Sequence, residues 1–290
     1  MKDLMSMEKF SQESKIFDRA ISVIIPTYKP GEYIYECLAS VCKQSLSYNE
    51  YEVIVVVNGC KEPYVGNLSK YIENNQYRNV TVLQIDESGV SNARNYGIER
   101  SSGEFITFVD DDDIISHNYL KELLCISGVY CVGCSNSYSF TDGIDKKKDN
   151  FLTSAFKSCQ GTSFNHFRWR KFLSPPVGKL IHRDIIGVDR FPVTISRSED
   201  SVFCLRISRK IKDMRLASES CIYYIRERAG SVTRRKRTTF QEIRALFNIE
   251  LTYISVWLKH PFSYDIRFVF TRIAAGFKNF IHYCKGNKKS

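Results

Sequence analysis

Short apolar runs alternate with helical patterns along the first 115 residues. Four runs read as buried strands, at residues 21–25, 51–57, 80–85 and 105–109. Helical spacing of apolar residues fills the intervals between them. Strands that alternate with helices in this way predict an α/β fold with a parallel sheet and right-handed crossovers.

The pattern is less regular after residue 116. A helix is predicted to about residue 126, and a strand over residues 128–140. Residues 141–165 are polar and predict a mobile loop. Two more strands, at 177–182 and 214–225, flank a helix predicted over 198–210.

Two amphipathic helices are predicted near the C-terminal end, on either side of Pro261. Apolar residues recur at steps of three and four from Phe240 to Leu258, and again from Ile266 to Ile281. No uninterrupted apolar run reaches the ~18 residues that a membrane-spanning helix needs.

Positive charge is concentrated in this C-terminal part. The chain has a formal net charge of +10, and residues 226–290 hold 14 Lys and Arg against 4 Asp and Glu. Basic amphipathic helices suit an anionic membrane surface. Packing on the preceding domain and dimerisation explain the same pattern equally well. The basic excess lies outside any recognisable nucleic-acid motif, so no nucleic-acid partner is expected.

The ten cysteines are scattered, and the polar start of the chain lacks the apolar core of a secretory signal. We therefore expect reduced thiols and a cytoplasmic location. Cys131 and Cys134 form one C-x-x-C pair without a matching second pair. A buried strand explains this pair better than a zinc site.

Four consecutive carboxylates, Asp110–Asp113, directly follow the strand predicted at 105–109. Side by side they repel one another, and a bound divalent cation is the natural remedy. Such cations commonly serve a phosphate-bearing ligand. The carboxyl ends of two other strands carry Pro26–Tyr28 and Asn58, and ligands of parallel sheets bind beyond this edge. A solvated acidic turn is the simpler alternative.

Four segments in order resemble the family 2 glycosyltransferases of the GT-A fold. They are residues 22–29 (SVIIPTYK), 88–113 (SGVSNARNYGIERSSGEFITFVDDDD), 177–192 with 198–203, and 223–233. The resemblance implies a Rossmann-like, mostly parallel sheet flanked by helices, followed by C-terminal amphipathic helices. It divides the chain into an extension (1–19), a catalytic domain (20–235) and a basic helical tail (236–290). Within the domain, residues 20–115 would bind nucleotide and residues 116–235 the acceptor.

The resemblance implies an inverting enzyme that uses Mn²⁺ or Mg²⁺. It would move a sugar from a nucleotide-diphosphate donor, with UDP-hexose or UDP-N-acetylhexosamine favoured, to a lipid-linked or oligosaccharide acceptor. Bacterial surface polysaccharide synthesis at the inner face of the cytoplasmic membrane is the expected setting. A catalytically silent nucleotide-sugar or glycan-binding protein is one alternative. A sugar nucleotidyltransferase is another, which the Pro-Thr-Tyr-Lys loop after the first strand disfavours. The oligomeric state stays open.

The resemblance also implies roles for individual residues. Asp200 is the candidate base, and Asp112 is the candidate metal ligand within the D-x-D motif Asp110–Asp112. The expected donor-nucleotide contacts are Pro26, Thr27, Tyr28, Asn58, Arg94, Asp110, Asp111 and Arg228. The expected acceptor contacts are Lys179, His182 and Glu199.

Several of these residues have simpler explanations. Glu199 and Asp200 also suit the positive end of a helix dipole, Arg228 a solvated basic turn, and His182 a hydrogen-bonded structural position. Asn58 stands where relatives commonly carry a carboxylate that reads uracil. Its amide can still accept and donate, so base recognition could survive. The change weakens the case for a uridine donor in particular, and thymidine and guanosine donors stay open.

Overall fold

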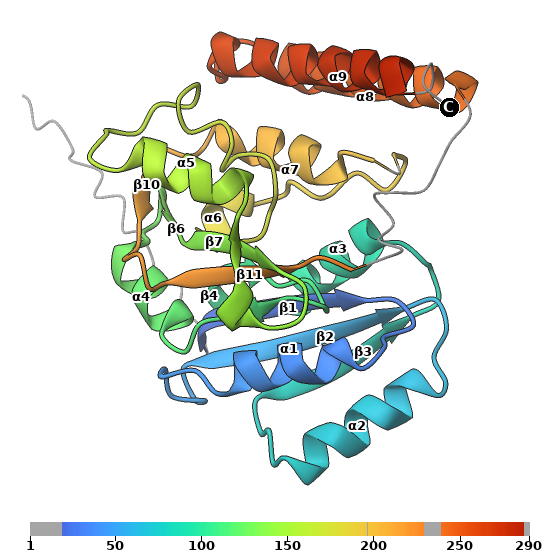
Figure 1. The fold of residues 1–290 in the computed structure, drawn as a ribbon, viewed down its shortest axis with the longest axis vertical. Helices are drawn as coiled ribbons and strands as arrows, with labels where there is room; N and C mark the ends of the chain where they lie inside the picture. Colours follow the sequence, from blue (N-terminus) through green and yellow to red (C-terminus); the bar gives the residue numbers. More distant parts are fainter. Residues whose placement is uncertain (1–18, 196, 229–238, 287–290) are drawn as a thin grey trace, which may run out of the picture.

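The computed structural model describes residues 19–195, 197–228 and 239–286 (Figure 1). Nearly all of the predicted N-terminal extension, and the join between the domain and the tail, lie outside these residues. Side chains of the last helix are described as far as Gly276.

A seven-stranded, mostly parallel sheet forms the centre of the domain, which confirms the predicted α/β class. Strands β1, β2, β3 and β4 are parallel neighbours, and β9 runs antiparallel between β4 and β6. In spatial order the strands are β10 (Asp213–Leu216), β6 (Cys131–Cys134), β9 (Lys179–His182), β4 (Gly103–Phe108), β1 (Arg19–Thr27), β2 (Tyr51–Asn58) and β3 (Val80–Ile85).

Helices connect and flank these strands. They are α1 (Tyr33–Cys42), α2 (Tyr64–Asn74), α3 (Val90–Arg100), α4 (Tyr119–Ile126), α6 (Arg183–Ile186) and α7 (Glu199–Ser208). Helix α3 approaches β1 closely at Gly97, where a Cβ atom would lie 2.5 Å from Cγ2 of Ile24. This close approach fixes the position of α3 against the sheet.

A second sheet of four strands stands beside the first. Its strands, in spatial order, are β5 (Ile114–Ile115), β11 (Ile222–Arg226), β7 (Asn136–Phe140) and β8 (Lys148–Asp149). The single strands predicted at 128–140 and 214–225 are therefore wrong. Each splits into one strand of the large sheet and one of the small sheet, because the chain turns after β6 and after β10.

The loop predicted over residues 141–165 is also wrong, because this segment contains a 3₁₀ turn (Ile144–Lys146), β8 and helix α5 (Phe151–Cys159). Asn150 caps α5, and its Oδ1 accepts from the backbone of Leu152 at 2.8 Å and Thr153 at 3.0 Å. Leu152 and Phe156, one turn apart, are both buried.

The two amphipathic helices of the tail are confirmed as α8 (Thr239–Lys259) and α9 (Ile266–Gly286). Figure 1 shows them as a hairpin that forms an outer layer over α7. Tyr253 and Phe268 are buried in this contact, so one face of the hairpin packs on the domain that contains the sheets. Across the described residues, every helix falls short of the length or the apolar character that crossing a membrane requires.

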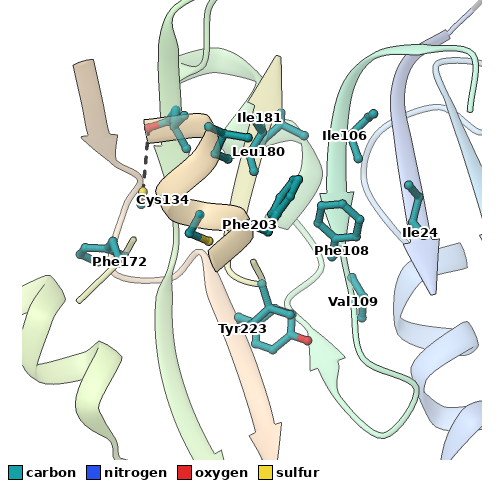
Figure 2. Close-up of a cluster of buried hydrophobic side chains, with 14 of the residues drawn as sticks. Ile24, Ile106, Phe108, Val109, Cys134, Phe172, Leu180, Ile181, Phe203 and Tyr223 are labelled. Atoms are coloured by element: carbon teal, nitrogen blue, oxygen red, sulfur yellow. Dashed lines mark hydrogen bonds between the residues drawn. The ribbon is translucent and has the colours of Figure 1, made fainter. Parts of the chain in front are cut away.

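Aromatic packing ties α7 to the sheet beneath the carboxyl end of β4. Figure 2 shows Phe108 between Ile24 and Phe203, and the rings of Phe108 and Phe203 are 6.1 Å apart in a T-shaped arrangement. Phe203 also stacks on Phe191 at 3.8 Å. Burying each of these rings contributes about 1.5–3 kcal/mol. The start of α7 is thereby held close to the acidic run.

Candidate active site

Arg94 joins two carboxylates that are far apart in the sequence. From helix α3, its Nη2 lies 2.8 Å from Oδ1 of Asp110, and its Nη1 lies 2.5 Å from Oδ1 of Asp200. The Arg94 side chain is only 3% exposed, and its guanidinium lies over the ring of Phe191. Burial acts to lower the pKa of Arg94, and the charges of Asp200 and Asp110 outweigh it and raise that pKa. The predicted base and the acidic run therefore share one cation.

The acidic run is a tight turn held by strand β11. The Asp110 backbone N–H donates to the hydroxyl of Tyr223 at 3.0 Å, and Oδ1 of Asp113 accepts from the Arg226 backbone at 2.8 Å. Asp113 is buried, and burial together with the neighbouring carboxylates raises its pKa well above the usual value. Asp113 is thus a structural member of the turn.

Asp111 faces the end of strand β1. Its Oδ2 accepts a hydrogen bond from Oγ1 of Thr27 at 2.5 Å. Burial raises the pKa of Asp111 to about 6, while the Thr27 hydrogen bond acts to lower it. Thr27 itself is buried, so it orients Asp111 from below.

Asp112 faces Arg228, whose Nε lies 2.7 Å from Oδ2 of Asp112. Burial raises the pKa of Asp112, and the Arg228 charge opposes that shift. Among the side chains that the structure describes, no three His, Cys, Asp or Glu gather as a ready-made metal cage. Mg²⁺ and similar ions need only one or two carboxylates when substrate phosphates complete the shell. The oxygen donors of Asp112 and Asp111 fit such an ion.

Asp200 begins helix α7 beside Glu199. Burial raises the pKa of Asp200 to about 6, and Arg94 opposes this by lowering it. The preceding residue, Ser198, has a left-handed backbone conformation and gives the helix no side-chain cap. Its Arg94 contact means that Asp200 does more than complement the helix dipole.

Three other predicted donor contacts lie along the same edge of the sheet. Pro26 and Thr27 end β1, and Tyr28 follows them with its side chain 54% exposed. Asn58 ends β2 and is only 2% exposed. Its Nδ2 donates to the Thr27 carbonyl at 2.7 Å, and its Oδ1 accepts from the Gly89 backbone at 2.8 Å. Asn58 thus links three loops, and its contact with a base stays a prediction.

The two acceptor contacts predicted on β9 separate in the structure. Since β9 runs antiparallel to β4, its first residue, Lys179, lies toward the carboxyl end of β4, whereas His182 pairs with Phe105 near the opposite end. His182 is 3% exposed and its Nδ1 accepts from the Asp184 backbone at 3.1 Å. These contacts suit the hydrogen-bonded structural position that is the simpler explanation of His182, and its contact with the acceptor stays a prediction.

Lys179 is 2% exposed, and its ammonium donates to the carbonyls of Pro175 and Val177. These carbonyls hold its ammonium inside the protein, and the contact of Lys179 with the acceptor stays a prediction. Glu199 remains available at the start of α7.

Two residues of the resembling segment 223–233 shape the site through contacts that the sequence does not reveal. Tyr223 lies in an apolar strand and reads as a core residue, yet its hydroxyl contacts the acidic turn. Arg226 donates to the Asp112 carbonyl at 2.9 Å and pairs with Glu36 at 2.6 Å. Both come from β11, whose place beside β5 is visible only in the fold.

The chain resembles known glycosyltransferases in sequence and in fold. A model of the family described as Glycosyl transferase family 2 matches residues 22–133. The chain is 26% identical over 224 residues to the poly(ribitol-phosphate) beta-N-acetylglucosaminyltransferase TarS of Staphylococcus aureus, which covers 72% of this chain and 36% of TarS. It is 34% identical to the glycosyltransferase GlyG of Streptococcus pneumoniae over 36% of this chain and 33% of GlyG. The chain therefore spans about a third of the length of these relatives.

One relative matches nearly end to end. An uncharacterized glycosyltransferase of Haemophilus influenzae is 24% identical over 91% of this chain and 98% of its own length. Among solved structures, residues 1–349 of S. aureus TarS with UDP-GlcNAc superimpose with a TM-score of 0.67 at 21% identity, covering 82% of this chain and 66% of that one. The mostly parallel sheet and flanking helices are those of the GT-A fold. Residues 22–133 thus form a family 2 glycosyltransferase domain.

Proposed function

We propose that this chain is an inverting glycosyltransferase that transfers a sugar from a nucleotide-diphosphate sugar to a glycan acceptor. The observation that carries the proposal is the placement of Asp200 beside the acidic turn, through the shared guanidinium of Arg94. A base next to a diphosphate-binding edge is the arrangement that a single displacement at the anomeric carbon requires.

Asp200 is the proposed base. Its carboxylate would take the proton of the acceptor hydroxyl while that oxygen bonds to the anomeric carbon. The bond from this carbon to the diphosphate breaks on the opposite face, and its electron pair leaves with the nucleotide. Arg94 holds the Asp200 carboxylate in place. The pKa of about 6 gives Asp200 enough basicity to act while it stays ionised at neutral pH.

Asp112 is the proposed ligand for Mn²⁺ or Mg²⁺, with Asp111 next to it. A bound divalent cation neutralises the charge that builds on the departing diphosphate. Arg228, 2.7 Å from Asp112, is placed to bind the same diphosphate, because a guanidinium recognises phosphate oxygens in pairs. Thr27, Tyr28 and Asp111 would contact the nucleoside.

A UDP-sugar donor, with hexose or N-acetylhexosamine, is the favoured substrate. TarS structures with UDP-GlcNAc and with UDP share the fold of this chain. Named relatives act on poly(ribitol-phosphate) with N-acetylglucosaminyl or glucosyl groups. We therefore propose a surface polysaccharide or its lipid-linked precursor as the acceptor, with the enzyme in the cytoplasm at the inner membrane face.

Isothermal calorimetry of the full chain with UDP, GDP and dTDP in Mn²⁺ tests the donor site. UDP is expected to bind most tightly, and UDP-sugars to be turned over slowly by hydrolysis. Absence of binding by all three nucleotides would refute the proposal. Binding without turnover across donors and acceptors would instead favour the catalytically silent alternative.

A further inference from the structure

A basic cleft lies outside the candidate active site, between helix α8 and the end of α7. It has a volume of about 530 Å³. The cationic residues among those that line it are Arg190, Arg206, Arg209 and Lys259. The proposed transfer reaction uses none of them.

The positive charge of this cleft is only partly neutralised, with Arg190 lying 3.6 Å from Glu99 at its edge. Its only lining carboxylate is Asp189, which already lies 3.0 Å from Arg209 and 3.4 Å from Lys210. Arg206 donates to a backbone carbonyl at 2.6 Å, which cancels no charge. Lys259 is exposed and makes no ion pair with any residue that the structure describes. The cleft is therefore built to receive an anion, and guanidinium groups suit phosphate oxygens.

An exposed apolar stripe runs along α8 next to the cleft. Its members recur at steps of three and four, and their side chains are between 39% and 63% exposed: Ile243, Phe247, Leu251, Ile254 and Leu258. Phe262, just beyond the helix, is fully exposed. Leu251 belongs both to the stripe and to the cleft lining. Apolar surface this continuous marks an interaction site.

The three faces of α8 thus have different surroundings. Ile249 and Tyr253 are buried on the catalytic domain, Lys259 faces the cleft, and the stripe stays open. Packing on the domain, one of the two alternatives for the tail, explains only the first face. A second copy of the chain fits poorly, because a symmetric contact along the stripe would bring two basic clefts together.

We propose that the stripe and the cleft together bind an anionic phospholipid bilayer. The cleft takes the phosphate of a lipid headgroup, and the stripe enters the boundary between headgroups and acyl chains. The inference deepens the proposed function. Membrane binding itself does not depend on sugar transfer, and only the purpose of that binding rests on the proposed function. Binding there would hold the sugar-transfer site at the surface that carries a lipid-linked acceptor.

Vesicle cosedimentation of the full chain tests the proposal without any turnover assay. The chain is expected to sediment with phosphatidylcholine vesicles that contain phosphatidylglycerol, and to stay in solution with phosphatidylcholine alone. Rising salt should weaken the binding, because exposed charges are screened. Equal binding to both vesicles, or to neither, would overturn the proposal.

Two variants separate the parts of the surface. Lys259→Gln should weaken binding to the anionic vesicles by about fivefold, the usual effect of one cation near such a surface. Phe247→Ser with Leu258→Ser should weaken it by more than about tenfold, since two large apolar groups no longer leave water. Lys121→Gln with Val129→Ser, both exposed on the catalytic domain, is the matched control and should bind like the unchanged chain.

Sedimentation equilibrium tests whether a second copy of the chain, instead of a bilayer, covers the stripe. If the unchanged chain is a dimer that the Phe247 and Leu258 changes convert to a monomer, the stripe is a self-association surface and the proposal is wrong. If Lys259→Gln binds anionic vesicles as tightly as the unchanged chain, the cleft is not a headgroup site. Nucleotide binding measured on the same variants keeps these outcomes apart from failure of the transferase proposal.

Discussion

Arg94 and Asp200 are 106 positions apart in sequence, yet Nη1 of Arg94 lies 2.5 Å from Oδ1 of Asp200. The contact spans the domain, from α3 in the predicted nucleotide-binding half to α7 in the predicted acceptor-binding half. The same guanidinium holds Asp110 at 2.8 Å. A change at this one buried cation should therefore affect both halves of the site.

Replacing the proposed base should remove transfer while donor binding survives. Asp200→Asn keeps the size of the side chain but cannot take a proton, so kcat should fall by about 10²–10⁴-fold. Calorimetry should give a UDP affinity close to that of the unchanged enzyme. Asp149→Asn, an exposed carboxylate paired with Lys157, is the control and should keep full activity. A kcat unchanged in Asp200→Asn would remove Asp200 from the mechanism.

The pH profile should report the same carboxyl group. Since the pKa of Asp200 is about 6, kcat at saturating donor should fall about tenfold per pH unit below that value. The pKa of Asp200 in the folded chain lies above the usual 3.8. Its contribution to the free energy of unfolding is therefore largest below pH ~4, and it is lost as the pH rises through 6. Thermal unfolding should accordingly show Asp200→Asn gaining stability relative to the unchanged chain between pH 5 and 8.

The sequence predicted the sheet and the acidic edge because both depend on local pattern. Apolar runs closed by Pro26 and by the four aspartates identify strand ends without any tertiary information. The role of Arg94 as a bridge could not be predicted, because it depends on how α7 docks against α3. The place of His182 could not be predicted either, since the antiparallel direction of β9 decides which edge of the sheet it reaches. The helix α5 was missed because a polar stretch hid the cap at Asn150.

Removing the shared cation should shift the acid limb of the pH profile. Arg94 lowers the pKa of Asp200, so in Arg94→Met the pKa should rise further and the fall in kcat should begin at a higher pH. Asp110 and Asp200, whose side chains are 39% and 34% exposed, would lose their shared cation, so the free energy of unfolding should also fall. Arg100→Met, at the exposed end of the same helix, should change neither quantity. If kcat falls at the same pH in Arg94→Met as in the unchanged enzyme, Arg94 does not lower the pKa of Asp200.

The metal ion that turnover requires should be bound through Asp112. Loss of a group that only supports a metal ligand weakens metal binding by about 10–100-fold. Asp112→Asn removes a ligand itself, so the Mn²⁺ concentration for half-maximal turnover should rise by more than that. Electron paramagnetic resonance of Mn²⁺ in the presence of UDP measures ion binding without turnover. Chelation by EDTA should abolish activity in the unchanged enzyme. Activity that survives both chelation and the Asp112 change would mean that Arg228 binds the diphosphate without a metal ion.

A change at Asn58 tests whether this side chain has a structural role or contacts the nucleotide base. In Asn58→Asp the carboxylate can no longer donate to the Thr27 carbonyl, and the two oxygens would face each other in a buried site. The free energy of unfolding in urea should fall by about 1–3 kcal/mol, the usual cost of an unsatisfied buried group. Asn75→Asp replaces an exposed amide that donates to the Tyr71 carbonyl at 2.9 Å, and it should change stability far less. If Asn58→Asp instead left stability unchanged and tightened UDP binding, the side chain would be a reader of the base, and the link between the β1 and β2 loops would not depend on it.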